Sequence, residues 1–411
     1  EQAAFLLHTL PAKVHTVIQA RLAQLSPPAR ELAALAAAIG RAFAYDVLAR
    51  ATAPPEATLV NSLDELCQLR IIREQGSDGY NFTHDKLREV AYNTLSAARR
   101  RLLHRRLAQV LVALHQPQLD AVSGQVATHY ELGGLTAEAV PHYHRAAEVA
   151  QRVYANADAI RYYRHALALL EGLTQDQQGM APLLYEHLAE LLLLTSQIDE
   201  SRSAYQRAMA AIPPADCMSK ARLHRKIGNT WREQYQYKAA QRSYAEAEWV
   251  LGEAPFSDAA SQAARQRPAD WWQEWIQVAL EVDHVHYWLG PLQASDELRE
   301  KLQPAIERYG TLHQQASFLQ HGVMIEFRRR QSVATPAMVV TVKTALSLLQ
   351  AAEAHARLPS VQFVVGFMQL WSGDPEGACL PFQTVLTLAE QTGDLSLQAR
   401  CLTYLAIAQR Q

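Results

Sequence analysis

The sequence predicts a mostly α-helical protein in which a small domain with a β-hairpin precedes a long array of helical repeats. Two observations predict this fold class. Within residues 1–100, three stretches of helical periodicity come before two short β-type stretches, which are joined by a turn at residues 76–79. From about residue 120 onward, a small–aromatic–small pattern returns at helical spacing.

The composition agrees with a folded protein. Of 411 residues, 49% are hydrophobic and 19% are charged, which supplies a sizeable core. The net charge of -2 gives no sign of a nucleic-acid or membrane partner. The four cysteines form no CxxC pair, and this favours packing roles in a reducing cytoplasm over disulfides or zinc.

The sequence predicts no membrane span, because no apolar run approaches the roughly 18 residues that a span requires. The chain begins Glu1-Gln2-Ala3 without an initiator methionine, and it ends within the helical pattern of Leu402, Leu405 and Ala406. We therefore expect an excised, cytoplasmic piece of a longer protein.

Three helices are predicted near the start. The first ends at Ser26-Pro27-Pro28, the second ends at Gly40, and the third opens after Pro54-Pro55. A short segment around 46–50 separates the last two. The expected buried positions are Val14, Ile18, Leu22 and Leu25 in the first helix, Leu32, Leu35, Ala36 and Ile39 in the second, and Val60, Leu63 and Cys67 in the third.

A β-hairpin is predicted next. Ile71-Ile72-Arg73-Glu74 is typical of a strand, Gly76-Ser77-Asp78-Gly79 supplies the turn, and Tyr80-Asn81-Phe82-Thr83 returns. Three helices followed by a two-stranded wing indicate a winged helix over residues 28–97.

DNA binding is the obvious function of a winged helix, and the third helix argues against it. Residues 55–69 hold Glu56, Asp64 and Glu65 and no basic residue, so they would repel phosphates. The basic cluster at Arg99–Arg101 with His104–Arg106 is interpreted as a solvated face or a contact for a neighbouring domain, because no aromatic residues interleave with it. We expect no direct nucleic-acid binding.

Residues 98–411 are predicted to form a helical linker arm and a repeat array. The pattern is a small residue, an aromatic residue four positions later and a small residue three after that, with another small residue twelve positions upstream. It occurs as Ala139/Tyr143/Ala146, Ala159/Tyr163/Ala166, Ser201/Tyr205/Ala208, Ala240/Tyr244/Ala247 and Ala378/Phe382/Val385, with Ala127, Ala189, Gly228 and Gly366 upstream. This is the tetratricopeptide signature, and we expect a tetratricopeptide-like α-solenoid.

A tryptophan-rich helix is predicted at residues 270–290. Trp271, Trp275, Val278, Val282, Val285 and Leu289 share one face, which favours packing between repeats. The alternative is an aromatic-lined ligand or partner surface that uses Trp272, His286 and Tyr287. The pairs His284/His286 and His142/His144 are each two residues apart and diverge on a helix, so we expect no metal site.

His84 is the principal candidate site residue. It lies where the predicted hairpin ends and a helix begins, so its N–H can reach a phosphate beside a helix N-terminus, which itself favours anions. The alternative is that His84 caps its own helix. No GxxxxGK[ST] loop occurs in the chain, and no catalytic order of Ser, His and Asp is evident, so we expect this chain not to be an enzyme.

Several motifs resemble the C-terminal portion of bacterial STAND-type ATPases, the signal-transducing switches that include MalT-like transcription activators. They are Leu10-Pro11-x-x-Val14, Arg21-Leu22-x-x-Leu25-Ser26, Ala37-Ala38-Ile39-Gly40-Arg41-x-Phe43, Phe82-x-His84-Asp85, Arg88-Glu89-x-Ala91-Tyr92, Trp271-Trp272-x-Glu274-Trp275 and Tyr287-Trp288-Leu289-Gly290. The resemblance implies that residues 1–27 lead out of an upstream nucleotide-binding domain.

The resemblance also implies a role for His84, since in such proteins a winged-helix histidine contacts the phosphates of bound ADP and holds the switch closed. No cofactor is expected on this chain alone, and ADP or ATP with Mg²⁺ is expected in the full-length protein. The chain would then be a regulatory fragment whose repeats bind an inducer, which is a peptide, a protein or a small molecule. The alternative is a passive tetratricopeptide scaffold for protein–protein interaction.

Overall fold

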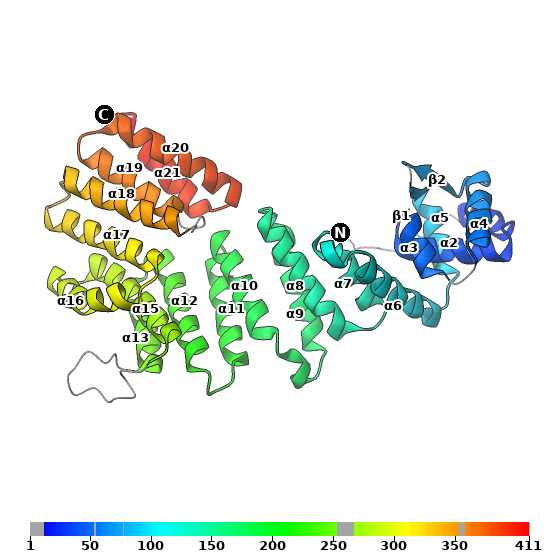
Figure 1. Ribbon diagram of the computed structural model, residues 1–411, viewed down its shortest axis with the longest axis horizontal. Helices are drawn as coiled ribbons and strands as arrows, with labels where there is room; N and C mark the ends of the chain where they lie inside the picture. The colour runs from blue at the N-terminus through cyan, green and yellow to red at the C-terminus, as the bar shows by residue number, and fades with distance from the viewer. Residues whose placement is uncertain (1–11, 53–54, 77, 253–266, 353–357, 411) are drawn as a thin grey trace. The chain divides into compact units, whose positions relative to one another are not determined.

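The computed structural model describes residues 12–52, 55–76, 78–252, 267–352 and 358–410 (Figure 1). The chain divides into two compact units, which we call the N-terminal unit (1–150 with 164–178) and the repeat unit (151–163 with 179–411). The predictions made for Leu10, Pro11, Pro54, Ser77 and the side chain of Val14 lie outside the described residues.

The N-terminal unit is mostly helical. Its elements up to the start of the repeats are α1 (Ala12–Ala23), α2 (Pro27–Ile39), α3 (Tyr45–Ala51), α4 (Glu56–Gln68), α5 (Asp85–Asn93), α6 (Ala97–Leu114), the 3-10 helix η1 (Gln116–Val122) and α7 (Ser123–Leu132). The predicted end signals are confirmed: the Ser26 hydroxyl caps α2 by accepting from the Ala29 amide at 3.3 Å, and Gly40 follows its last residue with φ +154°. Helices α2, α4, α5 and α6 pack around one apolar core.

A three-stranded antiparallel sheet completes this unit. The strands β1 (Ala42–Ala44), β2 (Ile72–Gln75) and β3 (Gly79–Phe82) lie in the order β1-β3-β2, and Phe43 pairs with Tyr80. The predicted hairpin is confirmed as β2 and β3, each one residue from its expected position. Strand β1 was not predicted.

The third predicted helix, α4, buries a different face from the one expected. Leu59, Leu63 and Leu66 are buried, whereas Val60 is 43% exposed and Cys67 is half-buried. Of the three positions expected in this helix, Leu63 is fully buried and Cys67 packs against the core from a partly buried position. The segment around residues 46–50 forms the short helix α3.

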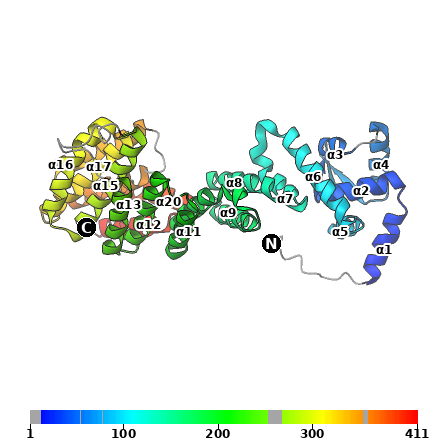
Figure 2. The same cartoon turned by 90° about the horizontal axis from the view of Figure 1, so that it is seen from below.

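Helical hairpins build the rest of the chain (Figure 2). The helices are α8 (Thr136–Arg152), α9 (Asn156–Glu171), α10 (Ala181–Leu194), α11 (Ile198–Ala211), α12 (Cys217–Glu233), α13 (Tyr237–Leu251), α15 (Ala269–Leu289), α16 (Leu292–Tyr309), α17 (Leu312–Arg329), α18 (Pro336–Ala351), α19 (Leu358–Trp371), α20 (Pro375–Thr392) and α21 (Leu395–Ala408), with the 3-10 helix η2 (Gln175–Gln178) after α9. Within the repeat unit, consecutive helices from α10 to α13 and from α15 to α21 pack against each other. None of the described helices combines the length and the apolar character that crossing a membrane requires.

The small–aromatic–small positions lie in the interior of these hairpins. Every member of the five copies is buried, and the aromatic rings Tyr163, Tyr244 and Phe382 are fully inaccessible. In the α12–α13 hairpin a Cβ on Gly228 would lie 2.3 Å from Cε1 of Tyr244, so only glycine leaves room for this ring. The pattern therefore reports size complementarity between paired helices.

The repeat unit also brings distant segments into contact. The side-chain amide of Asn156, at the start of α9, donates to the carbonyl oxygen of Thr392, the last residue of α20, at 2.9 Å. Repeats in a solenoid normally touch only their neighbours. This bond joins residues that lie 236 positions apart.

Candidate functional site

His84 lies at the N-cap position of α5 with its side chain exposed. Its backbone is extended (φ -143°, ψ 137°), and its carbonyl oxygen accepts from the Leu87 amide at 3.0 Å. The side chain makes no capping bond, so the alternative of a histidine that caps its own helix does not describe this structure. Among the described residues the imidazole has no hydrogen-bond partner, which leaves both nitrogens accessible.

Thr83 fixes the chain immediately before His84. Its amide donates to the Ile71 carbonyl at 3.0 Å, and its hydroxyl donates to the Arg70 carbonyl at 2.7 Å. Arg70 adopts a left-handed conformation with φ +51°, which turns the chain from α4 into β2. The position of His84 is therefore set by the hairpin and not by contacts of its own ring.

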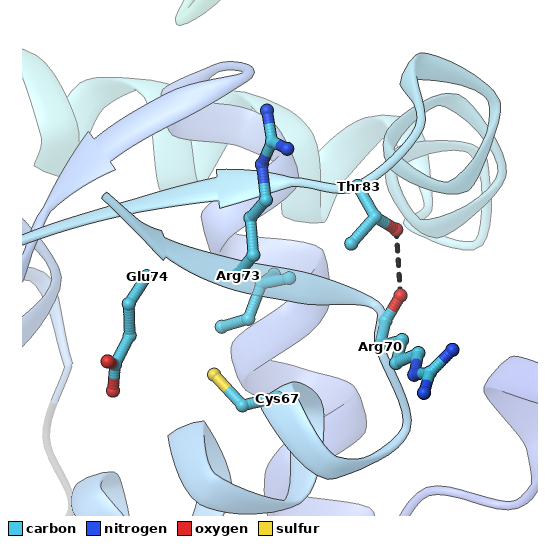
Figure 3. A pocket seen from close by; sticks show the side chains of 6 residues that line it. Cys67, Arg70, Arg73, Glu74 and Thr83 are labelled. Carbon is cyan, nitrogen blue, oxygen red and sulfur yellow. Dashed lines mark hydrogen bonds between the residues drawn. The ribbon is translucent and has the colours of Figure 1, made fainter.

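An open hollow lies beside Thr83 (Figure 3). Its lining residues are Cys67, Arg70, Ile72, Arg73, Glu74 and Thr83. Burial raises the pKa of the Cys67 thiol, and the negative charges of Glu74 and Asp64 raise it further, so the sulfur is not a thiolate nucleophile at neutral pH. Arg70, Arg73 and Glu74 are exposed, and the side chains of Arg73 and Glu74 point away from each other in Figure 3, so the three charged groups do not converge on one point.

The acidic face of α4 has a partly structural explanation. The carboxylate of Glu65 accepts from the Ser26 amide at 2.7 Å and from the Ser26 hydroxyl at 2.6 Å, which ties α4 to the start of α2. Glu56 and Asp64 remain exposed. No basic side chain of this helix stands ready to meet a phosphate.

The basic cluster of α6 needs one correction, because His104 is not on a solvated face. It is 2% exposed, and with Leu107, Ala108 and Leu111 it forms the buried side of α6. The arginines next to it remain at the surface, where Arg99 pairs with Glu31 at 2.8 Å.

His104 belongs to a buried polar network. Its Nε2 lies 2.8 Å from the Tyr92 hydroxyl, and its Nδ1 lies 2.9 Å from Nδ1 of His129. Burial lowers the pKa of His104 to about 4, with a smaller contribution from Arg100. Burial also lowers the pKa of His129 to about 3, with a smaller contribution from His104. The network joins α5, α6 and α7 through two neutral imidazoles.

The tryptophan-rich helix α15 packs mainly into the core. Trp271, Trp272 and Trp275 are all nearly inaccessible, and the Trp272 ring stacks on Tyr309 with centroids 4.6 Å apart. The prediction that this helix packs into the core between repeats is therefore confirmed for these three rings. The end of the predicted face is exposed, because Leu289 is 41% accessible.

The prediction of a ligand surface made of Trp272, His286 and Tyr287 is wrong for Trp272, because this residue is only 4% exposed. A helix rises about 1.5 Å per residue, so Tyr287 lies roughly 22 Å along α15 from Trp272. His286 and Tyr287 are half-buried. The three side chains do not form one site.

Tyr287 lies instead among residues that the sequence analysis did not connect. Arg328 of α17 donates to the Tyr287 carbonyl oxygen, and its guanidinium lies 5.9 Å from the centre of the Tyr287 ring. Trp288, which is half-exposed, packs edge-on to Tyr287 and stacks on Tyr237 of α13. Helical spacing within α15 gives no signal for partners on α13 and α17.

Comparison with known proteins yields no matching family model. A stretch of 174 residues, 40% of this chain, is 33% identical to the uncharacterized protein R02095 of Rhizobium meliloti (strain 1021). The match covers 16% of that relative, so this chain corresponds to a small part of its length.

Two solved structures share the fold. One is PH0952 from Pyrococcus horikoshii, a STAND protein with a tetratricopeptide repeat sensor, at 12% identity and a TM-score of 0.50, covering 96% of this chain and 55% of that one. The other is aspartyl phosphate phosphatase F from Bacillus subtilis, at 14% identity and a TM-score of 0.50, covering 82% of each chain. The chain therefore has a tetratricopeptide-like helical repeat fold.

Proposed function

We propose that this chain is the sensor and regulatory part of a nucleotide-controlled signal-transduction switch. Its repeats bind an inducer or partner, and residues 28–97, which we interpret as a winged helix, couple that event to an upstream nucleotide-binding domain. The observation that carries the proposal is the exposed imidazole of His84 at the start of the nine-residue helix α5. This imidazole has no hydrogen-bond partner among the described residues.

The surroundings of His84 suit a phosphate. The N-terminus of α5 favours an anion, and an imidazole N–H adds a directed donor. Asp85 opposes an anion, but Arg41 pairs with it at 3.2 Å and offsets its charge. In the full-length protein we expect ADP or ATP with Mg²⁺ to be held mainly by the upstream domain, with His84 reaching the phosphates.

The likeness to PH0952 supports the sensor role, because its tetratricopeptide region is the sensor of a STAND protein. The four cysteines of this chain are free, which fits a reducing compartment such as the cytoplasm. The sensor role fits the same location. We propose no catalysis by this chain itself, and any ATPase activity would belong to the full-length protein.

The test is ADP binding by the full-length protein that contains this chain, with and without His84→Ala. Loss of a hydrogen bond to a charged group removes about 1.5–3 kcal/mol, so ADP affinity should fall roughly ten- to a hundredfold and basal output should rise. His115→Ala, which changes another histidine of the N-terminal unit at the end of α6, is the matched control and should bind ADP normally.

Equal ADP affinity in the wild type and His84→Ala would contradict the proposed role of His84. No nucleotide dependence at all would favour the second candidate, a passive repeat scaffold that docks partner proteins.

A further inference from the structure

A group of aromatic side chains at the surface of the repeat unit is not explained by core packing. It consists of Tyr235 in the turn between α12 and α13, Tyr237 at the start of α13, and Tyr287 and Trp288 at the end of α15. Tyr235 is 74% exposed and Trp288 is 50% exposed, whereas Tyr237 and Tyr287 are half-buried. Large apolar side chains scattered singly over a surface are ordinary, but a contiguous group marks an interaction site. We call these four side chains the aromatic row.

Each ring of the aromatic row contacts the next. The rings of Tyr235 and Tyr237 are nearly perpendicular, with centroids 6.3 Å apart, and Tyr237 stacks on Trp288 at 5.4 Å. Trp288 then meets Tyr287 edge-on at 4.9 Å. Helices α13 and α15 pack against each other, and the row runs across their contact.

The backbone of Tyr235 is strained. It has φ +59°, in the left-handed region that bulky residues rarely adopt. Gly134 and Gly373 hold the same place in the α7–α8 and α19–α20 turns, two residues after the first helix ends, and glycine adopts this conformation without a steric cost. Strained residues concentrate at binding sites. The fold therefore keeps a tyrosine where glycine would be easier, although most of its side chain lies in solvent.

The polar groups of the aromatic row are available to a ligand. The hydroxyls of Tyr235, Tyr237 and Tyr287 and the indole N–H of Trp288 have no hydrogen-bond partner within the described part of the chain. Hydroxyl and indole groups donate hydrogen bonds, and here they stand beside apolar ring surface. An extended peptide lying on the rings would accept these bonds with its backbone carbonyl oxygens.

This combination suits a polyproline II segment. Such a segment has no internal hydrogen bonds, so its carbonyl oxygens are free to accept, and its proline rings pack on aromatic side chains. Because Tyr237 contacts both of the more exposed rings, the centroids of Tyr235 and Trp288 are no more than about 12 Å apart, and one polyproline II turn of three residues advances about 9 Å. Two prolines three positions apart can therefore pack on both rings.

A cation lies at one end of the aromatic row. The exposed guanidinium of Arg328 lies 5.9 Å from the centre of the Tyr287 ring. Its Nη1 donates to carbonyl oxygens at the end of α15, among them those of His286 and Gly290 at 3.3 Å. Its Nη2 and Nε have no partner among the described residues, and none of these residues forms an ion pair with it. The charge therefore complements a carboxylate on the partner.

We propose that the aromatic row docks a proline-rich segment of a partner protein, with an acidic residue of that segment against Arg328. The exposed rings take the prolines, the hydroxyl and indole groups hold the backbone, and the guanidinium fixes the direction of the bound chain. The proposal rests on the proposed function and deepens it, because it names the class of partner that the repeats bind.

Equilibrium dialysis of the full-length protein against three matched peptide pools tests the proposal. In the first pool, two prolines three positions apart and a glutamate on either side of them are fixed, and the other positions are random. The second pool has alanine in place of both prolines, and the third has lysine in place of each glutamate. Since a few anchor residues carry most of the binding energy of an interface, we expect retention of the first pool to exceed that of the other two about tenfold.

Tyr235→Gly separates binding from folding. Glycine relieves the strain at φ +59°, so the melting temperature should stay the same or rise, whereas retention of the first pool should fall about tenfold. Tyr154→Gly is the matched control and should bind like the wild type. Tyr154 has φ +57° at the same place in the α8–α9 turn, and its ring contacts no other ring among the described residues. Arg328→Gln should remove the preference for glutamate over lysine and keep the preference for proline over alanine.

Equal retention of the first and second pools would overturn the proposal, since another kind of segment would then occupy the aromatic row. Equal retention of the first and third pools, or wild-type binding by Tyr235→Gly, would overturn it as well. ADP binding on the same samples separates the two proposals. An ADP effect of His84 without any preference among the pools overturns this one alone, and a proline preference without nucleotide dependence overturns the switch and leaves a scaffold for proline-rich partners.

Discussion

Helix contacts in the two units depend on different chemistry. In the repeat unit, α12 and α13 fit because Gly228 leaves space for the Tyr244 ring. In the N-terminal unit, α5, α6 and α7 are joined by hydrogen bonds from the Tyr92 hydroxyl through His104 to His129. The α12–α13 contact is sensitive to the side-chain volume at position 228. The contact among α5, α6 and α7 is sensitive to protonation of its two histidines. These two contacts should therefore respond most strongly to different perturbations.

The difference bears on the proposed switch, because Tyr92 lies on the same helix that begins at His84. The orientation of α5 depends on its contacts with α2 and on the bond to His104 on α6. A change in the imidazole network would shift the helix N-terminus that we propose to face a phosphate. The α12–α13 contact has a polar link of another kind, in which the Tyr244 hydroxyl donates to the amide oxygen of Asn229 on the paired helix at 2.8 Å and no imidazole takes part.

Acid should produce the largest difference between the two contacts. The unfolded chain protonates its histidines near pH 6.5, whereas the folded pKa values are about 4 for His104 and about 3 for His129. Stability present above pH 6.5 is lost as the pH falls, by about 1.4 kcal/mol per pH unit for each histidine. Hydrogen exchange at pH 7 and pH 4.5, corrected for intrinsic rates, should show that α6 and α7 lose protection before α12 and α13.

The double variant His104→Leu and His129→Leu is the control for this prediction, since it removes both titrating groups and should flatten the acid dependence of α6 and α7. Loss of protection in α12 and α13 at the same pH would contradict the comparison.

Volume should produce the next largest effect. The Cβ of Gly228→Ala would overlap the buried Tyr244 ring, and overpacking of this kind costs about 1–3 kcal/mol. Urea denaturation followed through the α12–α13 region should report this loss, with α5–α7 unaffected. Gly179→Ala, where a Cβ meets nothing within 4 Å, should leave stability unchanged. A Gly228→Ala protein as stable as the wild type would show that the ring has room to move.

Sequence periodicity predicts the volume-dependent contacts well, because their partners recur at fixed offsets. Ala240, Tyr244 and Ala247 follow a pattern that encodes its own geometry, and all three are buried. Strand β1 has only three residues and forms by pairing with β3, almost forty positions later in the chain. No local signal of comparable strength marks it.

The polar contacts are harder to predict. His104 was grouped with neighbouring arginines by charge, although its spacing to Leu107 and Leu111 places it on the buried face of α6. For Trp272 and Tyr287, aromatic character suggested one site, but their separation along α15 excludes it. The rings of His284 and His321 lie 5.3 Å apart only because α15 packs against α17, which no spacing within one helix reveals. His84 was placed at a strand–helix junction by local signals, and the structure has it there.

The smallest expected effect comes from removing one tyrosine hydroxyl from each of the two contacts. Tyr92→Phe leaves Nε2 of His104 without its partner inside the core, which costs about 1–3 kcal/mol. Tyr244→Phe takes a donor from Asn229, which is half-buried and can be reached by water, so the cost should stay nearer 1 kcal/mol. Melting temperatures of the two variants, measured at pH 7, should therefore differ, with the Tyr92→Phe protein the less stable. Equal losses would mean that the imidazole nitrogen finds water when the hydroxyl is gone, and the N-terminal unit would then depend less on its polar network than the hydrogen bonds suggest.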